Sequence, residues 1–182
     1  FSYAGKHVEL MHELAPRAVN LAILLNPTNA GARTYVVDAM EAGRRFNLRI
    51  AVAEVARVED FQHAFALIRD MGADGLLVMG DPLIGDHRGE VFAFAASARL
   101  PAAYDPPNMA RYGGLVAYGP LQVEHYVMAA GYVDRILKGA RPSDLPVEQP
   151  TRFELVVNLK TARALGLTIP QLLIARADDV IQ

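Results

Sequence analysis

The chain contains no cysteine, which excludes disulfides, thiolate metal sites and a thiol nucleophile. No apolar run approaches the roughly 18 residues that would indicate a transmembrane helix. Lys and Arg together number 18 against 20 Asp and Glu, so the formal net charge is -2, and the basic residues form no stripe. This balance lacks the electrostatic signature of a nucleic-acid-binding or anionic-membrane-binding surface. We therefore expect no nucleic-acid partner.

Three further kinds of site are absent from the sequence. The segments Asn26–Gly31 and Gly80–Gly85 have neither the lysine nor the glycine spacing of a P-loop or a dinucleotide fingerprint. The histidines include no pair with established metal-ligand spacing, and only His87 lies near the expected ligand-binding edge. No Gly-x-Ser-x-Gly elbow is present, and Ser97 falls inside an expected helix. We therefore expect no metal, no cofactor and no catalytic nucleophile.

What the sequence does contain is a repeated unit of a short apolar strand closed by a proline turn. The unit occurs at 21–25 before Asn26-Pro27, at 75–79 before Gly80-Asp81-Pro82, and at 102–104 before Asp105-Pro106. Apolar runs without alternation are typical of strands buried on both faces of a parallel sheet. Further strands are expected at 48–55, 114–118 and 152–157.

Helical patterns separate these strands. Helices are expected at 3–15, 31–47, 59–72, 88–99, 121–138 and 159–165. In the second of them the spacing places Val36, Met40 and Gly43 on the buried face. Alternation of strand and helix predicts an α/β fold, with an open, mostly parallel sheet of five to six strands, helices on both faces and right-handed crossovers. The simplest strand order is the flavodoxin-like 2-1-3-4-5.

Polar residues follow the strands at one edge of this sheet, where ligands bind in open α/β folds. A carboxylate there can hold a ligand ammonium, amide and hydroxyl groups can hold a carboxylate, and tyrosines supply flat apolar surface. As an alternative, the same aspartates are turn formers and the tyrosines core fillers. The candidate ligand-binding residues are Asn26, Thr28, Asn29, Asp81, Tyr104, Asp105 and Tyr118.

Several stretches resemble the substrate-binding proteins of ABC transporters, in the group of tryptophan- and tyrosine-type amino-acid binders with a type I periplasmic binding fold. They are Phe1-Ser2-Tyr3-Ala4-Gly5-Lys6, Leu24-Leu25-Asn26-Pro27, Asp81-Pro82-Leu83, Gly113–Gly119, Tyr132–Gly139 and the tail Leu145–Ala162. Members of this family have two lobes that trap ligand between them, and this chain resembles the second lobe alone. The resemblance implies that Asn26, Asp81, Asp105 and Tyr118 face the ligand.

The resemblance also implies a domain organisation. Residues 1–119 would form the ligand-binding lobe, and residues 120–145 a crossover helix and connector that pack on the first lobe. Residues 146–182 would return to the ligand-binding lobe. The signal peptide and the first lobe are expected to precede Phe1, which places the protein in the periplasm or another extracytoplasmic space.

The function expected from these features is that of a solute-binding component of an ABC importer, without enzymatic activity. Its partners would be a small organic solute, such as an amino acid, and the transporter permease. The alternatives are a ligand-sensing domain of a signalling protein, or a flavodoxin-like or hydrolase enzyme using Asp81, Asp105 and His87 as acid and base. The wide apolar face of Leu121–Lys138 would also favour a homodimer if the first lobe is missing.

Overall fold

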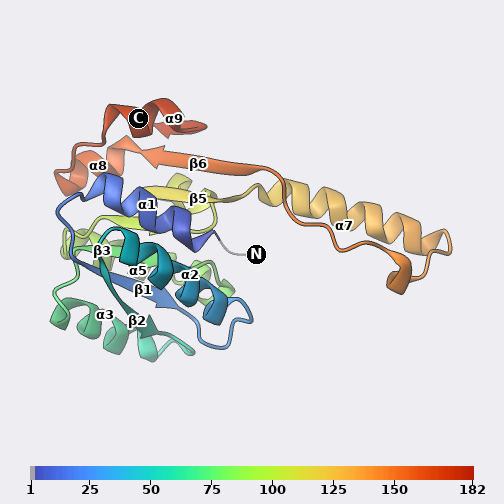
Figure 1. Cartoon of the computed structure of the whole chain (residues 1–182), viewed down its shortest axis with the longest axis horizontal. Coiled ribbons are helices and arrows are strands. Elements are labelled where there is room, and N and C mark those ends of the chain that lie inside the picture. The colour runs from blue at the N-terminus through green and yellow to red at the C-terminus, as the bar shows by residue number, and fades with distance from the viewer. Residues whose placement is uncertain (1–2) are drawn as a thin grey trace.

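Residues 3–182, which the computed structural model describes, form one sheet covered by helices on both faces (Figure 1). The strands are β1 (Asn20–Leu25), β2 (Arg49–Glu54), β3 (Gly75–Val78), β4 (Ala102–Tyr104), β5 (Val116–Pro120), β6 (Phe153–Asn158) and β7 (Asp179–Ile181). The helices are α1 (Ala4–Leu14), α2 (Ala32–Arg45), α3 (Asp60–Asp70), α4 (Pro82–Asp86), α5 (Arg88–Ser97), α6 (Asn108–Arg111), α7 (Gln122–Leu137), α8 (Leu159–Leu165) and α9 (Gln171–Arg176).

The sheet has the order β2-β1-β3-β4-β5-β6-β7. Strands β1 to β5 are parallel, β6 runs antiparallel to β5, and β7 is parallel to β6. The predicted α/β class and the order 2-1-3-4-5 of the first five strands are confirmed. The predicted number of five to six strands is too small, because β7 has only three residues and is a strand through its pairing with β6, not through an apolar pattern.

Strand β1 lies in the interior of the sheet, and its side chains divide two cores. Leu21, Ile23 and Leu25 pack in the core beneath α1 and α2, whereas Ala22 and Leu24 pack in the core beneath α3 and α5. Successive side chains of a strand point to opposite faces, so an apolar run without alternation fills both cores. This is why β1 is almost wholly inaccessible to solvent.

Helix α2 is rotated relative to its predicted orientation. Its buried side chains include Tyr35, Ala39 and Ala42, whereas Met40 is 37% exposed. Gly43 is buried as predicted, and an added Cβ there would lie 2.7 Å from Cδ1 of Ile50. Small residues at this contact let α2 approach its neighbours closely, and that packing decides which stripe of the helix is buried.

Helix α8 begins and ends at residue types that are typical of helix ends. The Oδ1 atom of Asn158 accepts a hydrogen bond of 2.9 Å from the backbone N–H of Thr161 and so caps α8. Gly166 ends the helix in the left-handed conformation with φ of +70°. Both residue types are typical of these positions, because caps depend on residues only a few positions apart.

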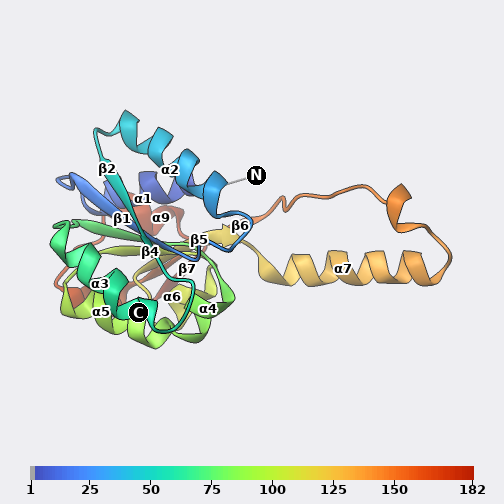
Figure 2. The ribbon, with the colours of Figure 1, turned by 90° about the horizontal axis from the view of Figure 1, so that it is seen from below.

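Helix α7 and the connector that follows it project from the body of the molecule as an extended arm, residues 122–152 (Figures 1 and 2). Within the described chain no α7 residue is buried. The arm is held together by its own contacts, including a hydrogen bond from the Tyr132 hydroxyl to the Pro146 carbonyl and an ion pair between Arg135 and Glu148. The exposed large apolar side chains of α7 are Val123, Tyr126, Val127, Val133, Ile136 and Leu137, and Val147 is exposed in the connector.

None of the helices formed by residues 3–182 combines the length and apolar character needed to cross a membrane.

Candidate functional site

A hydrogen-bonded polar network joins the carboxyl ends of β1 and β3. The amide nitrogens of Asn26 and Asn29 donate to the two carboxylate oxygens of Asp81, at 3.2 and 3.0 Å. Asp81 also accepts the N–H of Leu83 at 3.0 Å and thereby caps α4. The side-chain oxygen of Asn26 accepts from both the N–H and the hydroxyl of Thr28. The structure thus brings four predicted residues together at the switch point, with the Asp81 carboxylate already engaged in shaping the two loops.

Asp105, which follows β4, is the most deeply buried carboxyl group at this edge, with 9% of the residue exposed. The Tyr3 hydroxyl donates to its Oδ2 atom at 2.6 Å, and the Gly80 backbone N–H donates to the same carboxylate. A Cβ added to Gly80 or Gly119 would lie 2.6 Å from one of its oxygens. The carboxylate therefore occupies a space that exists because both neighbours are glycines.

An aromatic cluster adjoins this carboxyl group on the α1 side of the sheet. The Tyr3 ring meets His7, Tyr118 and Phe153 edge-to-face, with centroid distances of 5.5, 6.4 and 5.8 Å. Tyr118 and Phe153 are stacked at 5.6 Å. Tyr3, Tyr118 and Phe153 are each only partly buried. The edge therefore presents flat apolar surfaces beside a buried carboxylate.

His7 packs against the rings of Tyr3 and Tyr118 and is completely buried. Its Nε2 lies 2.7 Å from the Tyr118 carbonyl, so Nε2 carries the proton, and Nδ1 accepts the Tyr35 hydroxyl at 2.7 Å. Both contacts suit the neutral imidazole. Burial lowers the pKa of His7 to about 4, although the bond to the Tyr118 carbonyl acts in the opposite direction. Burial likewise raises the pKa of Asp105 to about 6, against the hydrogen bonds from Tyr3 and Gly80.

The two shifts have opposite consequences for stability. Between pH 6.5 and about 4 the unfolded state binds more protons than folded His7, so this group favours folding as pH rises. Between pH 3.8 and about 6 folded Asp105 binds more protons than the unfolded chain, so this group disfavours folding as pH rises. We therefore expect the native protein to show only a weak net pH dependence from this pair.

Asp105→Asn is expected to separate the two effects. The free energy of unfolding of the variant, relative to that of the native protein, should increase by about 2–3 kcal/mol from pH 4 to pH 7. The reason is that only the native protein loses stability when the buried carboxyl ionises. Urea denaturation of both proteins across this range measures the difference. A difference that stays constant with pH would show that Asp105 ionises as readily in the folded as in the unfolded chain.

Tyr104 lies away from this edge, in contrast to its predicted position. Tyr104 is the last residue of β4, directly before Asp105. Its side chain points to the opposite face of the sheet from Tyr118, lies beneath α5 and is 1% exposed. Its side chain belongs to the same core as Ala117, its partner on β5, whereas Tyr118 is the next residue along that strand and points the other way. The structure therefore assigns it to the core.

A shallow hollow of about 350 Å³ adjoins Asp81 on its other side and includes Asn108 and Tyr112. The side-chain oxygen of Asn108 is buried without a hydrogen-bond partner in the described chain. His87 does not contribute to the hollow, because its ring packs on Phe61 and its Nδ1 lies 3.0 Å from the Leu83 carbonyl. Among residues 3–182 no cluster of three or more His, Asp or Glu side chains could hold a metal ion.

Tyr3, His7, Tyr35, Asn108 and Phe153 were not predicted as site residues. Three of them belong to α1, α2 or β6, and Tyr3 directly precedes α1; none of these elements ends in the proline-turn motif. Only strand order and helix packing bring them to the ends of β4 and β5. One sequence feature could have identified Tyr35. It is the large side chain on the helix face that also carries Ala32, Ala39 and Ala42, but the buried face of α2 was predicted one residue away from this one.

Comparison with known proteins identifies the family of this chain. Residues 2–181 match the family described as ABC transporter substrate binding protein. The chain belongs to this family. No curated protein matches it. The family consists of substrate-binding proteins, which agrees with the prediction of a binding protein and not an enzyme.

Solved structures confirm the fold of this substrate-binding family member. An ABC domain from Streptococcus pneumoniae, in complex with L-Trp, is 25% identical, with a TM-score of 0.90 over 98% of this chain and 62% of its own. A conserved domain protein from Vibrio cholerae is also 25% identical, with a TM-score of 0.91 over 99% and 60%.

A third structure shares the fold at lower similarity. The ligand-free, open form of a substrate-binding protein with adhesive properties from Clostridium difficile is 19% identical, with a TM-score of 0.73 over 100% of this chain and 60% of its own. The chain thus spans about 60% of the length of the solved proteins that it resembles.

Proposed function

We propose that this chain is the second lobe of an extracytoplasmic solute-binding protein that captures a small organic solute, such as an amino acid, for the permease of an ABC importer. The observation that carries the proposal is the buried Asp105 carboxylate, enclosed by Tyr3 and two glycines and bordered by the partly exposed rings of Tyr118 and Phe153. Membership of the substrate-binding family and the L-Trp complex of the Streptococcus protein support it.

The chemistry of this edge fits a solute with an ammonium group and an apolar body. A carboxylate in a partly desolvated site pairs strongly with a cation, and aromatic rings accept apolar or aromatic side chains. Asn26, Thr28 and Asn29 provide amide and hydroxyl groups near the carboxyl end of β1, where a solute carboxylate could be held. The first lobe would supply the other half of the site.

The arm supports the assignment of this chain to one lobe of a larger protein. Its exposed apolar side chains are not covered by the body, which is expected if residues 120–145 pack against the first lobe and the chain returns at residue 146. The relatives have the additional length that a first lobe requires.

A thermal-shift screen of the full-length protein tests the proposed function. We expect an amino acid with an apolar side chain to raise the melting temperature, since a ligand at about 100 times its Kd stabilises the folded state by about 2.7 kcal/mol. Nucleotides and flavins serve as the comparison. Stabilisation by these cofactors, without stabilisation by any amino acid or small carboxylate, would contradict the solute-binding role.

If the chain is produced without the first lobe, it should associate through α7. Burial of the exposed face against a second copy, by a symmetric contact or by exchange of the helix, removes apolar surface from water. Light scattering should therefore detect a dimer, and Val127→Lys should shift it towards monomer, with the exposed Val147→Lys outside the helix as the control. A strict monomer at high concentration, unaffected by Val127→Lys, would contradict the lobe assignment.

A further inference from the structure

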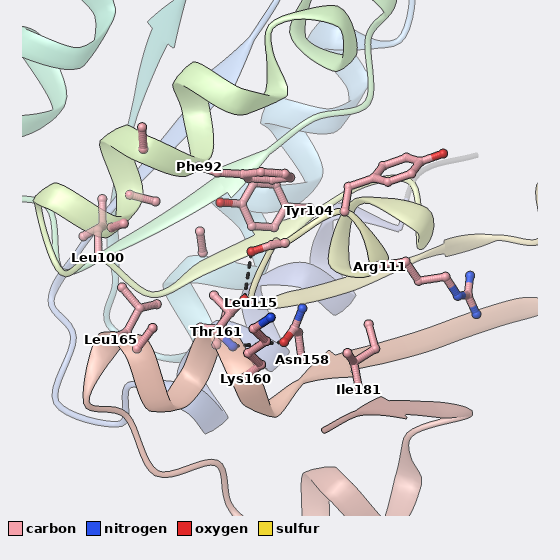
Figure 3. A pocket seen from close by; sticks show the side chains of 17 residues that line it. Phe92, Leu100, Tyr104, Arg111, Leu115, Asn158, Lys160, Thr161, Leu165 and Ile181 are labelled. Carbon is pink, nitrogen blue, oxygen red and sulfur yellow. Dashed lines mark hydrogen bonds between the residues drawn. The ribbon is translucent and has the colours of Figure 1, made fainter.

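A second cavity, of about 580 Å³, includes Tyr104 in its wall (Figure 3) and shares Tyr112 with the hollow beside Asp81. It is formed between α5, α8 and the amino ends of β4 and β5, and its wall includes Phe92, Leu100, Leu115, Leu165 and Ile181. Small-molecule sites are typically cavities of about 300–1,000 Å³ with mostly apolar walls.

The cavity wall includes a tyrosine hydroxyl that has no hydrogen-bond partner among residues 3–182. Tyr104 is 1% exposed, and its ring packs edge-to-face against Phe92 at 5.3 Å. Figure 3 shows the ring beside Phe92 with its hydroxyl directed into the cavity towards Leu100. In the described chain this hydroxyl makes no hydrogen bond, and burial raises its pKa. Because this hydroxyl faces the cavity and is not engaged within the protein, it is available to a ligand.

The charges on the cavity wall have one sign. Arg111 and Lys160 are the charged residues that line it, and no Asp or Glu does. Arg111 is already paired with Glu154 and Asp179. Lys160, at the exposed rim on α8, has no ion pair within residues 3–182. A ligand that enters past this lysine is therefore favoured if it carries a negative charge.

We propose that this cavity is a second binding site, which takes an apolar carboxylic acid bearing a hydroxyl or oxo group on its body. The carboxylate pairs with Lys160 at the rim, the apolar body fills the space between Phe92 and Leu165, and the second polar group hydrogen-bonds to the Tyr104 hydroxyl. The site differs in its residues from the proposed amino-acid site, which uses Asp105 and the aromatic cluster around it.

Calorimetric titration of the full-length protein with 10-hydroxydecanoate tests this site, with decanoate and decylamine as comparison probes. We expect saturable binding of one hydroxydecanoate per chain, weaker binding of decanoate and none of decylamine. Lys160→Glu should weaken hydroxydecanoate binding by about tenfold or more, since it replaces attraction with repulsion. Arg163→Glu, on the same helix with the same change of charge but outside the cavity, should leave affinity within about twofold.

Two further variants identify the cavity itself. Tyr104→Phe should lower the affinity for hydroxydecanoate about tenfold, to that of decanoate, and leave decanoate binding unchanged, because only the hydroxyl is removed. Ala164→Trp, which places a large ring at the cavity wall, should block both acids. Amino-acid binding should persist in Lys160→Glu and Tyr104→Phe, so failure of one site is distinguishable from failure of the other. The proposal would be overturned if neither acid showed saturable binding, or if Lys160→Glu and Arg163→Glu changed the affinity for hydroxydecanoate equally.

Discussion

Asp105→Ala in the full-length protein is expected to weaken binding of an ammonium-bearing solute by about ten- to a hundredfold, which corresponds to loss of a charge-assisted hydrogen bond of about 1.5–3 kcal/mol. The carboxylate is buried, so water competes poorly for the ammonium, and no other carboxylate at this edge is as deeply enclosed. Calorimetry with the solute identified by the thermal-shift screen measures the loss.

Asp81 and Asp86 provide the controls for this experiment. The Asp81 carboxylate already accepts hydrogen bonds from Asn26, Asn29 and Leu83, so Asp81→Ala should mainly reduce stability, by about 1 kcal/mol for the lost cap, with a smaller loss of affinity. Asp86 is exposed beside the same loop, and Asp86→Ala should have no effect on either property. Unchanged affinity in both Asp105→Ala and Asp81→Ala would assign these aspartates to turn formation.

His7→Ala is expected to produce the largest loss of folding stability, about 3–5 kcal/mol, because it leaves two buried polar groups without partners and opens a cavity. The hydroxyl of Tyr35 would lose its acceptor and the carbonyl of Tyr118 its donor. Urea denaturation at pH 7 measures the change in the free energy of unfolding.

The matched control for His7 is His63, which is exposed on α3. His63→Ala should change stability by less than about 0.5 kcal/mol, as is usual for exposed surface positions. His7→Gln retains hydrogen-bonding groups of similar reach and should recover part of the loss. If His7→Ala destabilised the protein no more than His63→Ala, the buried hydrogen bonds between α1, α2 and β5 would contribute nothing to stability.

Much of the fold could be predicted because its signals are local. The apolar run of β1, the caps of α8 and the spacing in α3 each involve residues close together in the chain, and alternation of strands and helices limits the possible connections. The order of the first five strands followed from these rules. Strand β7 escaped prediction because its identity comes from pairing with β6, which no local pattern encodes.

The candidate site could be predicted only in part, for the same reason. Asn26 and Asp105 directly follow a strand, and Asp81 follows β3 after two residues, so sequence order alone places all three at the same edge of the sheet. Tyr104 also stands at a strand end, yet it points to the opposite face, because the register of β4 decides the direction of each side chain. Tertiary structure therefore places the adjacent side chains of Tyr104 and Asp105 in different surroundings.

The aromatic cluster around Asp105 was decided entirely by tertiary structure. Tyr3 lies 102 positions from Asp105, and His7 lies 28 and 111 positions from its partners Tyr35 and Tyr118. Burial in this cluster disfavours the charged form of each group, and so it lowers the pKa of His7 and raises that of Asp105. The sequence by itself determined the order of the first five strands, the edge at which the candidate residues lie and the apolar face of α7, because local patterns encode them. Packing between distant segments decided which groups lose water, and so which of them can act on a ligand.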